Sequence, residues 1–539
     1  MAAKPKQRAR YALILLALAY LTAVVLVLTR PGSALSNDKR VVIRFTHWQI
    51  EAGPREAFDA MIKRYEELNP NVRVEQVAVP GNVYNQWLRT QLIGGTASDI
   101  IEFGRHMQGM NDVPPRFFAP ISEYVELPNP YNRGTALEGV RWRDTFKDGL
   151  NSPDAYIPNL SNYYAVTQCM LSMRLYYNPE LLRELTGSEI PPSTYPEFLA
   201  LNDKLKARIA EPKDRVALLA GSRFNSYVLL DPMLTRVGLD VSYANDRFRL
   251  QGPAGPEVGL EYLRGGWNFR RPELLDGLNR MREVSTTMRP GFQQLERDAA
   301  VQDFLRGRAM MIVTGTWDAT SLTRMAPFKV GVTVVPWPTM ADGKIGRYYW
   351  TPISEGATTA MSLYLNKASH HSAEAIDFLQ FITSVEGNTI FVRESGWLPA
   401  VREVPIPDEL KVHLPNFDGY TARSNFSHGF GSETFNLWEK QAYRLTSANG
   451  SVEDFLQAIE AQFPTAVRRD IETDMRNIVL SVRRDITPLI ALAALDERVG
   501  LDQRERDSLA LRESNQTMIE AKLYEAQLVL EKGPNVTKP

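Results

Sequence analysis

Short apolar stretches alternate with amphipathic helical stretches along the chain, and this alternation limits the folds open to it. Residues 41–45 have the composition of a strand, and 72–77 alternate between apolar and polar side chains at the period of a strand. Between them, 54–68 begins with a proline suited to a first helical turn and carries an apolar stripe at helical spacing. A helix at 84–93 and a strand at 99–103 follow. This order predicts a mainly parallel sheet covered by helices.

Polar and aromatic residues lie directly at the ends of the first and third of these strands. In open α/β sheets, ligands bind beyond the carboxyl ends of the strands. His47 and Trp48 follow the first strand, and Glu102, Gly104 and Arg105 stand at the end of the third. We therefore expect these five residues to face a binding crevice.

The N-terminal region combines basic residues with a long uncharged run. Lys4, Lys6, Arg8 and Arg10 precede residues 11–29, which as a helix reach about 28 Å, close to the thickness of a bilayer core. Basic residues before the run place everything after it outside the cytoplasm. A cleavable signal peptide is the other interpretation, because small residues at 32–34 resemble a cleavage site. Both interpretations predict export to the periplasm or another extracytoplasmic space, with or without a membrane tether.

Composition excludes several classes of protein. The 539 residues carry a formal net charge of -1, and 44% of them are hydrophobic, which is too apolar for a long disordered chain. The near-zero charge gives no reason to expect nucleic acid as a partner. Cys169 is the single cysteine, so the chain has no internal disulfide and no CxxC metal or redox motif.

Strand and helix patterns continue through most of the remaining chain. The helices predicted there are at 179–185, 196–210, 300–308 and 373–383, and the strands at 163–177, 216–220, 309–313, 328–336 and 358–365.

The order of these segments, over about 41–403, resembles the extracellular solute-binding proteins of ATP-driven importers, in particular the large sugar-binding cluster that includes maltose-binding protein. Two departures separate the chain from that pattern: Thr167 replaces a usual proline, and Gly356-Ala357 replaces a Gly-Gly pair. The segments that carry the resemblance are Phe45-Thr46-His47-Trp48, Tyr164-Ala165-Val166, Leu175-Tyr176-Tyr177-Asn178, 304–317, 358–365, 373–383 and Gly396-Trp397-Leu398-Pro399.

The resemblance implies an α/β, two-lobed periplasmic-binding-protein (type II) fold, with each lobe assembled from separate chain segments. It also implies closure over a small carbohydrate by a hinge motion, followed by docking on permease subunits in the membrane. The expected divisions are a signal anchor or signal peptide at 1–40, lobe 1 at about 41–150 and 310–360, lobe 2 at about 151–309 and 361–470, and a charged helical extension at 471–539.

Sugar recognition asks for flat aromatic faces together with fixed hydrogen-bonding groups. Aromatic residues in loops after strands, and polar residues at strand ends, are therefore the candidates, with core packing or a surface ion pair as the alternative for each. Trp87, Trp142 and Trp438 lie on amphipathic helical stretches and are expected to pack in the core. The substrate-binding candidates are Trp48, Glu102, Arg105, Tyr164, Trp317, Trp350 and Trp397.

An enzyme has less support from the sequence. The motifs GxSxG, GxxxxGK[ST], HExxH and GxGxxG are absent, so no catalytic residue, metal or cofactor is expected. A membrane-anchored sugar-active enzyme remains an alternative. An envelope scaffold or ligand sensor is another, because 502–532 is dense in charge and could be a partner-binding helical tail or a solvated helix that packs on the binding domain.

Overall fold

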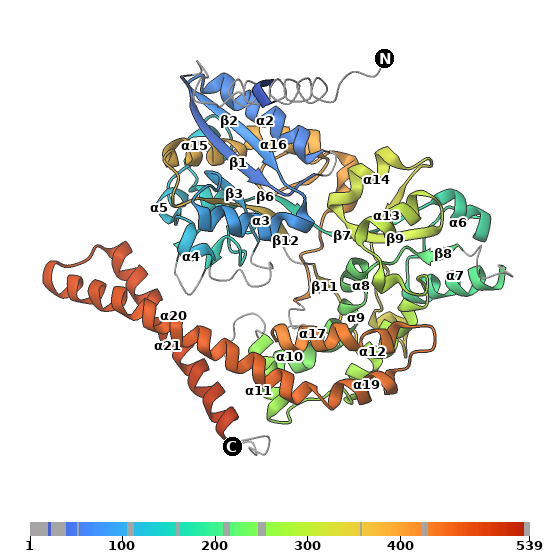
Figure 1. The fold of residues 1–539 in the computed structure, drawn as a ribbon. Coiled ribbons are helices and arrows are strands. Elements are labelled where there is room, and N and C mark those ends of the chain that lie inside the picture. The colour runs from blue at the N-terminus through green and yellow to red at the C-terminus, as the bar shows by residue number, and fades with distance from the viewer. Residues whose placement is uncertain are drawn as a thin grey trace, which may run out of the picture.

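The computed structural model describes residues 20–22, 39–50, 53–104, 113–157, 162–208, 216–245, 255–355, 358–421, 426 and 430–532. These residues form two α/β lobes, each built around its own sheet, and a long helical hairpin at the C-terminal end (Figure 1). The α/β class and the two-lobed architecture expected from the sequence are thereby confirmed.

Lobe 1 contains a six-stranded sheet in the order β13-β6-β12-β3-β1-β2. β1 pairs in parallel with β2 and β3, as the sequence predicted, while β12 runs antiparallel to both β3 and β6. β6 therefore runs in the same direction as β1. The strands are β1 (Val41–His47), β2 (Val72–Ala78), β3 (Ile100–Glu102), β6 (Ala165–Leu171), β12 (Thr358–Leu365) and β13 (Leu398–Pro399).

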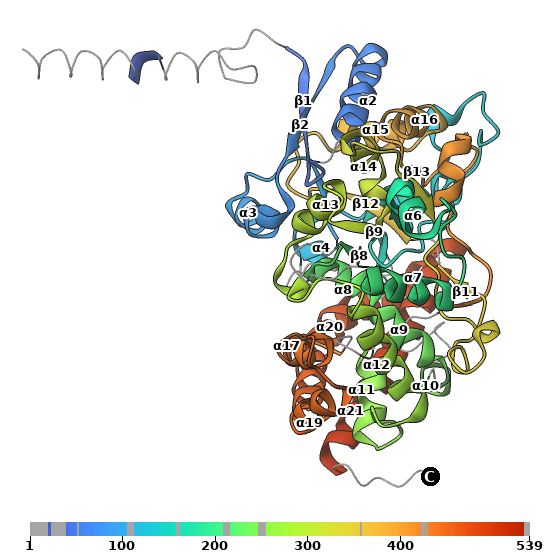
Figure 2. The same cartoon turned by 90° about the vertical axis from the view of Figure 1, so that its right-hand side faces the viewer.

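Helices cover both faces of this sheet. α2, α15 and α16 lie on one side of the strands and α3 on the other (Figure 2). The stripe predicted for the first helix is confirmed, because Phe58, Met61 and Tyr65 are fully buried in the core beneath α2. The helices of lobe 1 are α2 (Pro54–Leu68), α3 (Gly81–Gly94), α4 (Val113–Phe117), α5 (Ser122–Val125), α15 (Ser372–Ile382) and α16 (Val385–Ser395).

Lobe 2 contains a four-stranded sheet in the order β10-β7-β9-β8. β8 and β9 are parallel, and β7 runs antiparallel to β9 and β10. Its strands are β7 (Met173–Tyr177), β8 (Ala217–Leu219), β9 (Ala309–Gly315) and β10 (Gly331–Thr333). Its helices are α6 (Pro179–Thr186), α7 (Tyr195–Arg208), α8 (Arg223–Leu229), α9 (Asp231–Val237), α10 (Leu239–Asn245), α11 (Gly255–Leu263), α12 (Pro272–Ser285), α13 (Arg297–Leu305), α14 (Ala319–Met325), α17 (Ser432–Gln441), α18 (Tyr443–Thr446) and α19 (Val452–Glu460).

The chain crosses between the lobes at positions that differ from the expected ones. The expected division put 151–309 in lobe 2 and 310–360 in lobe 1, yet β6 belongs to the sheet of lobe 1, and β9, most of which was expected in lobe 1, belongs to that of lobe 2. Most of β12 and all of β13 were expected in lobe 2, but both strands complete the sheet of lobe 1. The first crossing is at Ser172, between β6 and β7. It lies inside the continuous apolar stretch 163–177, where composition gives no sign of a change of sheet.

The C-terminal extension begins inside the core of lobe 2. α20 (Phe463–Val499) and α21 (Gln503–Lys532) form an antiparallel hairpin whose far end projects beyond the lobes (Figure 1). Phe463, Val467 and Ile471 are buried among lobe 2 side chains, so the division expected at 471 falls within a single helix.

The apolar run expected to anchor the chain, 11–29, lies outside the described residues except for 20–22. Within the described residues, no helix has both the length and the apolar character needed to cross a membrane.

Asp470 joins the hairpin to lobe 2, and its loss should destabilise the fold. Its carboxylate accepts hydrogen bonds from the backbone N–H groups of Glu433 and Thr434, at 2.8 and 2.9 Å, at the start of α17. Asp470→Ala leaves these donors without their acceptor and should lower the free energy of unfolding by about 1–3 kcal/mol. Urea denaturation measures this, with Glu472→Ala on the same helix as the control. Equal stability of the two variants would contradict the assignment.

Candidate functional site

The loop after β1 is held to the end of β3 by a buried carboxylate. Glu102 is fully buried, and its two carboxylate oxygens accept hydrogen bonds from the backbone N–H of Trp48 at 3.0 Å and from Nε2 of Gln49 at 2.6 Å. β1 and β3 run in parallel and end at the same edge of the sheet. The structure thus brings Trp48 and Glu102 together as expected, but Glu102 holds the loop in place instead of projecting into solvent.

Three aromatic side chains lie together at this edge of lobe 1. The ring of Trp48 meets that of Tyr84 at 5.1 Å between centroids, and Tyr84 meets Trp87 at 5.9 Å. The Tyr84 hydroxyl donates to the backbone carbonyl of Glu102 at 2.6 Å, and burial raises the pKa of Tyr84 well above its ordinary value. Trp48 and Trp87 are half-buried. Together the three rings form an aromatic wall on lobe 1.

Sequence reasoning missed Tyr84 and assigned Trp87 to the core, and Trp87 does pack against the core while it stays half-buried. Both project from α3, three residues apart, and residues at this spacing share one side of a helix. An aromatic pair at that spacing, on the helix that follows β2, was the available signal.

His47 precedes Trp48, but its ring packs against Phe45 and Phe58 on the face of the sheet that α2 covers, and it is held in its neutral form. Burial lowers its pKa to about 4, and the charge of Arg55 acts in the same direction, against a hydrogen bond to Gln76 that raises it. Nδ1 accepts a hydrogen bond from the backbone N–H of Gln49, so Nε2 carries the proton and donates to Oε1 of Gln76 at 2.7 Å. His47 is fully buried and therefore fixes the loop after β1 without carrying charge.

A second aromatic pair stands at the strand ends of lobe 2. Trp317 follows β9, and its ring lies 5.9 Å from that of Phe224, which follows β8. Gly315 is required here because an added Cβ would lie 2.0 Å from the Trp317 ring. Trp317 is half-buried and also packs against the core of lobe 1. It thus lies where the two lobes meet.

A third aromatic group lies on the segments that run between the lobes. Trp350 precedes β11 (Ile353–Ser354), and its ring meets that of Tyr420 in β14 (Tyr420–Thr421) at 5.2 Å. Nearby in lobe 2, the guanidinium of Arg236 stands 4.5 Å from the Trp337 ring. Trp350 is half-buried, which leaves part of its ring available for contact.

The remaining candidates do not join these groups. Tyr164 is 6% exposed and packs among core side chains at the opposite end of β6 from the lobe crossing, because it precedes the strand. Trp397 is 2% exposed and packs against Phe391 in the core of lobe 1. The core alternative therefore holds for both. Arg105 lies outside the described residues.

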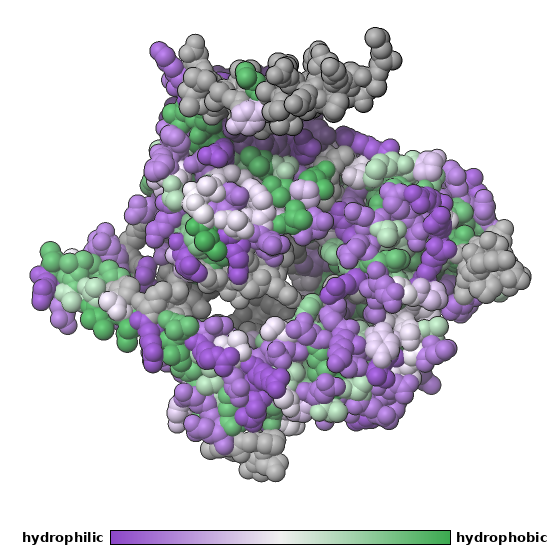
Figure 3. Space-filling view, in the orientation of Figure 1, coloured by the Kyte–Doolittle hydropathy of each residue, from purple (hydrophilic) through white to green (hydrophobic). Residues whose placement is uncertain are grey.

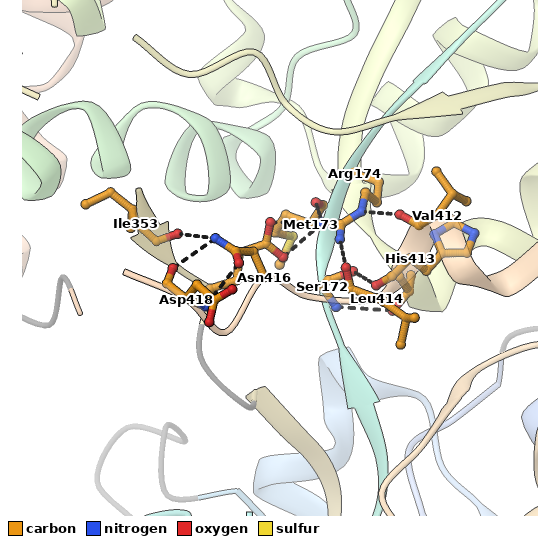
Figure 4. A network of polar contacts seen from close by, with 11 residues as sticks. Ser172, Met173, Arg174, Ile353, Val412, His413, Leu414, Asn416 and Asp418 are labelled. Carbon is orange, nitrogen blue, oxygen red and sulfur yellow. Dashed lines mark hydrogen bonds and ion pairs between the residues drawn. The ribbon is translucent and has the colours of Figure 1, made fainter. Parts of the chain in front are cut away.

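Arg174 binds the segments that cross between the lobes (Figure 4). Its guanidinium donates hydrogen bonds to the backbone carbonyls of Met173, Val412 and Leu414, and pairs with the Glu355 carboxylate at 3.0 Å. Ser172 adds a hydrogen bond from its hydroxyl to the carbonyl of His413. The three crossing segments are therefore joined at one point.

The surface is hollowed between the two lobes (Figure 3). A separate shallow groove of about 570 Å³ lies between α2 and α16, and its charged side chains include the ion pair of Arg64 with Glu386 at 2.7 Å.

Among the described residues, no cluster of three or more His, Cys, Asp or Glu side chains could hold a metal ion.

Comparison with known families identifies what this two-lobed architecture is. Residues 60–416 match the model of the bacterial extracellular solute-binding proteins. The chain belongs to this family. The match covers the three segments that cross between the lobes and most of both sheets. It ends before α17, so the C-terminal hairpin lies outside it. The family binds solutes, in agreement with the expectation of a binding protein and not an enzyme.

Two curated relatives are similar over most of the chain. A binding protein of Brucella abortus is 23% identical over 385 residues, which cover 71% of this chain and 81% of the relative. An uncharacterized extracellular-binding protein of an ABC transporter from Pyrococcus horikoshii is 20% identical over 382 residues, covering 70% of this chain and 75% of the relative.

Solved structures of sugar-binding proteins share the fold. The raffinose complex of RafE matches with a TM-score of 0.52 and 17% identity, over 79% of this chain and 100% of that one. The maltodextrin-binding domain MalE of Bdellovibrio bacteriovorus, bound to maltotriose, matches with a TM-score of 0.50 and 14% identity, over 81% of this chain and 100% of that one. These neighbours confirm the two-lobed periplasmic-binding-protein fold.

The buried neutral state of His47 makes stability depend on pH. Its pKa is about 4 in the folded protein against 6.5 ordinarily, so between these values the unfolded chain binds a proton that the folded chain excludes. The free energy of unfolding should therefore rise between pH 4 and 6.5, with a contribution from His47 on the order of 3 kcal/mol. His413, whose pKa burial also lowers to about 4, should act in the same direction.

Urea denaturation at pH 7.5 and 4.5 measures the effect. His47→Gln should reduce the loss of stability on acidification, while His370→Gln, at an exposed position, should leave it unchanged. The same acid sensitivity in His47→Gln and in the unmodified protein would contradict the prediction.

Proposed function

We propose that this protein captures a mono- or oligosaccharide between its lobes, outside the cytoplasmic membrane, and delivers it to the permease of an ATP-driven importer. The observation that carries the proposal is the presence of half-buried aromatic groups on both lobes and on the segments between them, around Trp48, Trp317 and Trp350. Structural neighbours bound to raffinose and maltotriose, and a relative described as part of an ABC transporter, support it.

The aromatic groups suit the chemistry of a sugar. An indole ring buries a large area against the C–H face of a pyranose at small cost in side-chain entropy. Trp48, Trp317 and Trp350 are the proposed stacking platforms, and Glu102 acts on Trp48 by positioning its loop. Arg105 follows β3 in the sequence and is the proposed partner of ligand hydroxyl or acidic groups.

Ligand capture requires that the closed arrangement bind more tightly than the open one. Contacts from both lobes supply this difference, because half of them are lost when the lobes separate. A shift from 1% to 99% closed takes about 5.5 kcal/mol of differential affinity. The closed form then presents both lobes together to the permease.

Calorimetric titration of the purified full chain in mild detergent tests the proposal. Raffinose, maltotriose and chitin oligosaccharides are the first ligands, with peptides and polyamines for comparison. We expect at least one saccharide to bind without product formation. Binding of peptides or polyamines alone would refute the substrate class, and release of smaller sugars would favour a membrane-anchored sugar-active enzyme.

Tryptophan variants then locate the site. Trp48→Ala and Trp350→Ala should each weaken saccharide binding about tenfold or more, with little change in the free energy of unfolding. Trp142→Ala is the matched control, because Trp142 is fully buried and its loss should cost about 3–5 kcal/mol of stability instead. Unchanged affinity in both surface variants would exclude these rings from the site.

The uncharged run 11–29 is proposed to remain as a membrane anchor that keeps the lobes close to the permease. Its support is the sequence pattern alone: basic residues before it and a length matched to a bilayer. Fractionation of expressing cells should find the protein in carbonate-washed membranes with its N-terminus intact. A soluble protein that begins near residue 35 would show that the run is a cleaved signal peptide.

A further inference from the structure

The far half of the C-terminal hairpin, residues 478–516, stands away from both lobes (Figure 1). The near half of the hairpin binds lobe 2 through the ion pairs of Glu525 with Arg264 and of Lys522 with Glu257, both 2.6 Å. The far half lies beyond the end of the family match at 416. Ligand capture by the lobes gives it no role.

One face of α20 in this far half is apolar and exposed. Ile486 is 42% exposed and Ile490 is 63% exposed, and residues four apart lie on the same side of a helix. Leu509 and Ile519 of α21, by contrast, are 8% and 7% exposed, while Ile486 and Ile490 remain largely uncovered by α21. The exposed ridge is therefore additional to the contacts that hold the hairpin together.

Opposite charges lie on either side of Ile490 at equal distances. Arg483 lies seven residues before Ile490 and Glu497 lies seven residues after it, and both side chains are exposed. Seven residues are close to two helical turns, so both charges share the face of Ile490, each about 10 Å from it along the axis. Along the helix, this face is positive at Arg483, apolar at Ile486 and Ile490, and negative at Glu497, with its centre at Ile490.

Two copies of this face are complementary when the two helices lie antiparallel. An antiparallel copy places positive against negative at both ends and apolar against apolar at the centre, which is the requirement of a two-fold interface. A partner of one charge would meet repulsion at one end of the face, because the two ends differ in sign. The charge pattern therefore favours a second copy of this chain over a uniformly charged surface.

We propose that the protein dimerises through antiparallel pairing of α20 about a two-fold axis near Ile490, with Ile486 and Ile490 packed across the axis and Arg483 opposite the partner's Glu497. With α21 on each outer side, the two hairpins form a four-helix bundle. The hairpin is rooted in lobe 2 through Ile471 and Asp470, so lobe 1 remains free to move relative to the bundle.

Cysteine cross-linking in membranes of cells that express the full chain tests the proposal. Cys169, the single native cysteine, is fully buried, so an introduced thiol reports on its own position. Ile490→Cys, next to the axis, should give a dimer on a non-reducing gel after mild oxidation. Leu495→Cys is the matched control: Leu495 is 45% exposed on the same helix but points about 140° away from Ile490. Absence of the dimer at Ile490→Cys, or equal cross-linking at both positions, would overturn the proposal.

Charge reversal distinguishes a second copy from any other partner. Arg483→Glu and Glu497→Arg should each weaken dimerisation at least tenfold in sedimentation of the purified full chain, because each places like charges opposite each other twice. The double variant restores opposite charges and should recover the dimer. Single variants that sediment as the unmodified protein does, or a double variant weaker than either, would refute the interface. Neither outcome depends on the identity of the ligand.

Discussion

The guanidinium of Arg174 joins three segments that cross between the two lobes. It is 1% exposed, and a charge buried so fully costs several kcal/mol unless its donors are satisfied. Carbonyls from 412–414, its neighbour Met173 and the Glu355 carboxylate satisfy them. The charge is therefore tolerated only when these segments lie side by side, which fixes the relative position of the segments at the crossing.

Trp48 and Trp317 are held in place in different ways. Trp48 is fixed to the sheet of lobe 1 through Glu102 and Gln49, and Trp317 is fixed to lobe 2 by its place directly after β9. Trp317 also packs against the core of lobe 1, so it contacts both lobes, whereas Trp48 is held within lobe 1.

Local sequence patterns were sufficient for the elements of the fold but not for their assembly. The parallel strands β1, β2 and β3 and the buried stripe of α2 followed from periodicity, because a strand or helix that packs on a core must repeat its apolar residues at a fixed spacing. The change of sheet at Ser172 carries no such signal. It depends on which strand β6 and β7 find as neighbours, and those neighbours lie more than a hundred residues away.

For the candidate site, too, the sequence predicted some features and not others. The sequence placed Trp48 and Glu102 correctly at the ends of adjacent strands, since the ends of parallel strands share an edge. The sequence did not indicate that Trp350 is half-buried while Trp397 is only 2% exposed, because both residues follow short polar or glycine-containing stretches. Arg174 carried no sequence motif, and its role arises only from the contacts that the folded chain gives it.

The interleaving of the two lobes along the chain also determines when the strands of each sheet become available during synthesis. The sheet of lobe 1 holds strands from both Val41–His47 and Leu398–Pro399, with most of lobe 2 inserted between them. A chain that emerges N-terminus first presents β1 and β3 long before β12 and β13 arrive to complete the sheet. Strand pairs so distant in sequence form slowly, because closing the long loop between them costs conformational entropy before the strand contacts can compensate for it. Over that interval the edge of β3 is open to chaperones, proteases and other nascent chains.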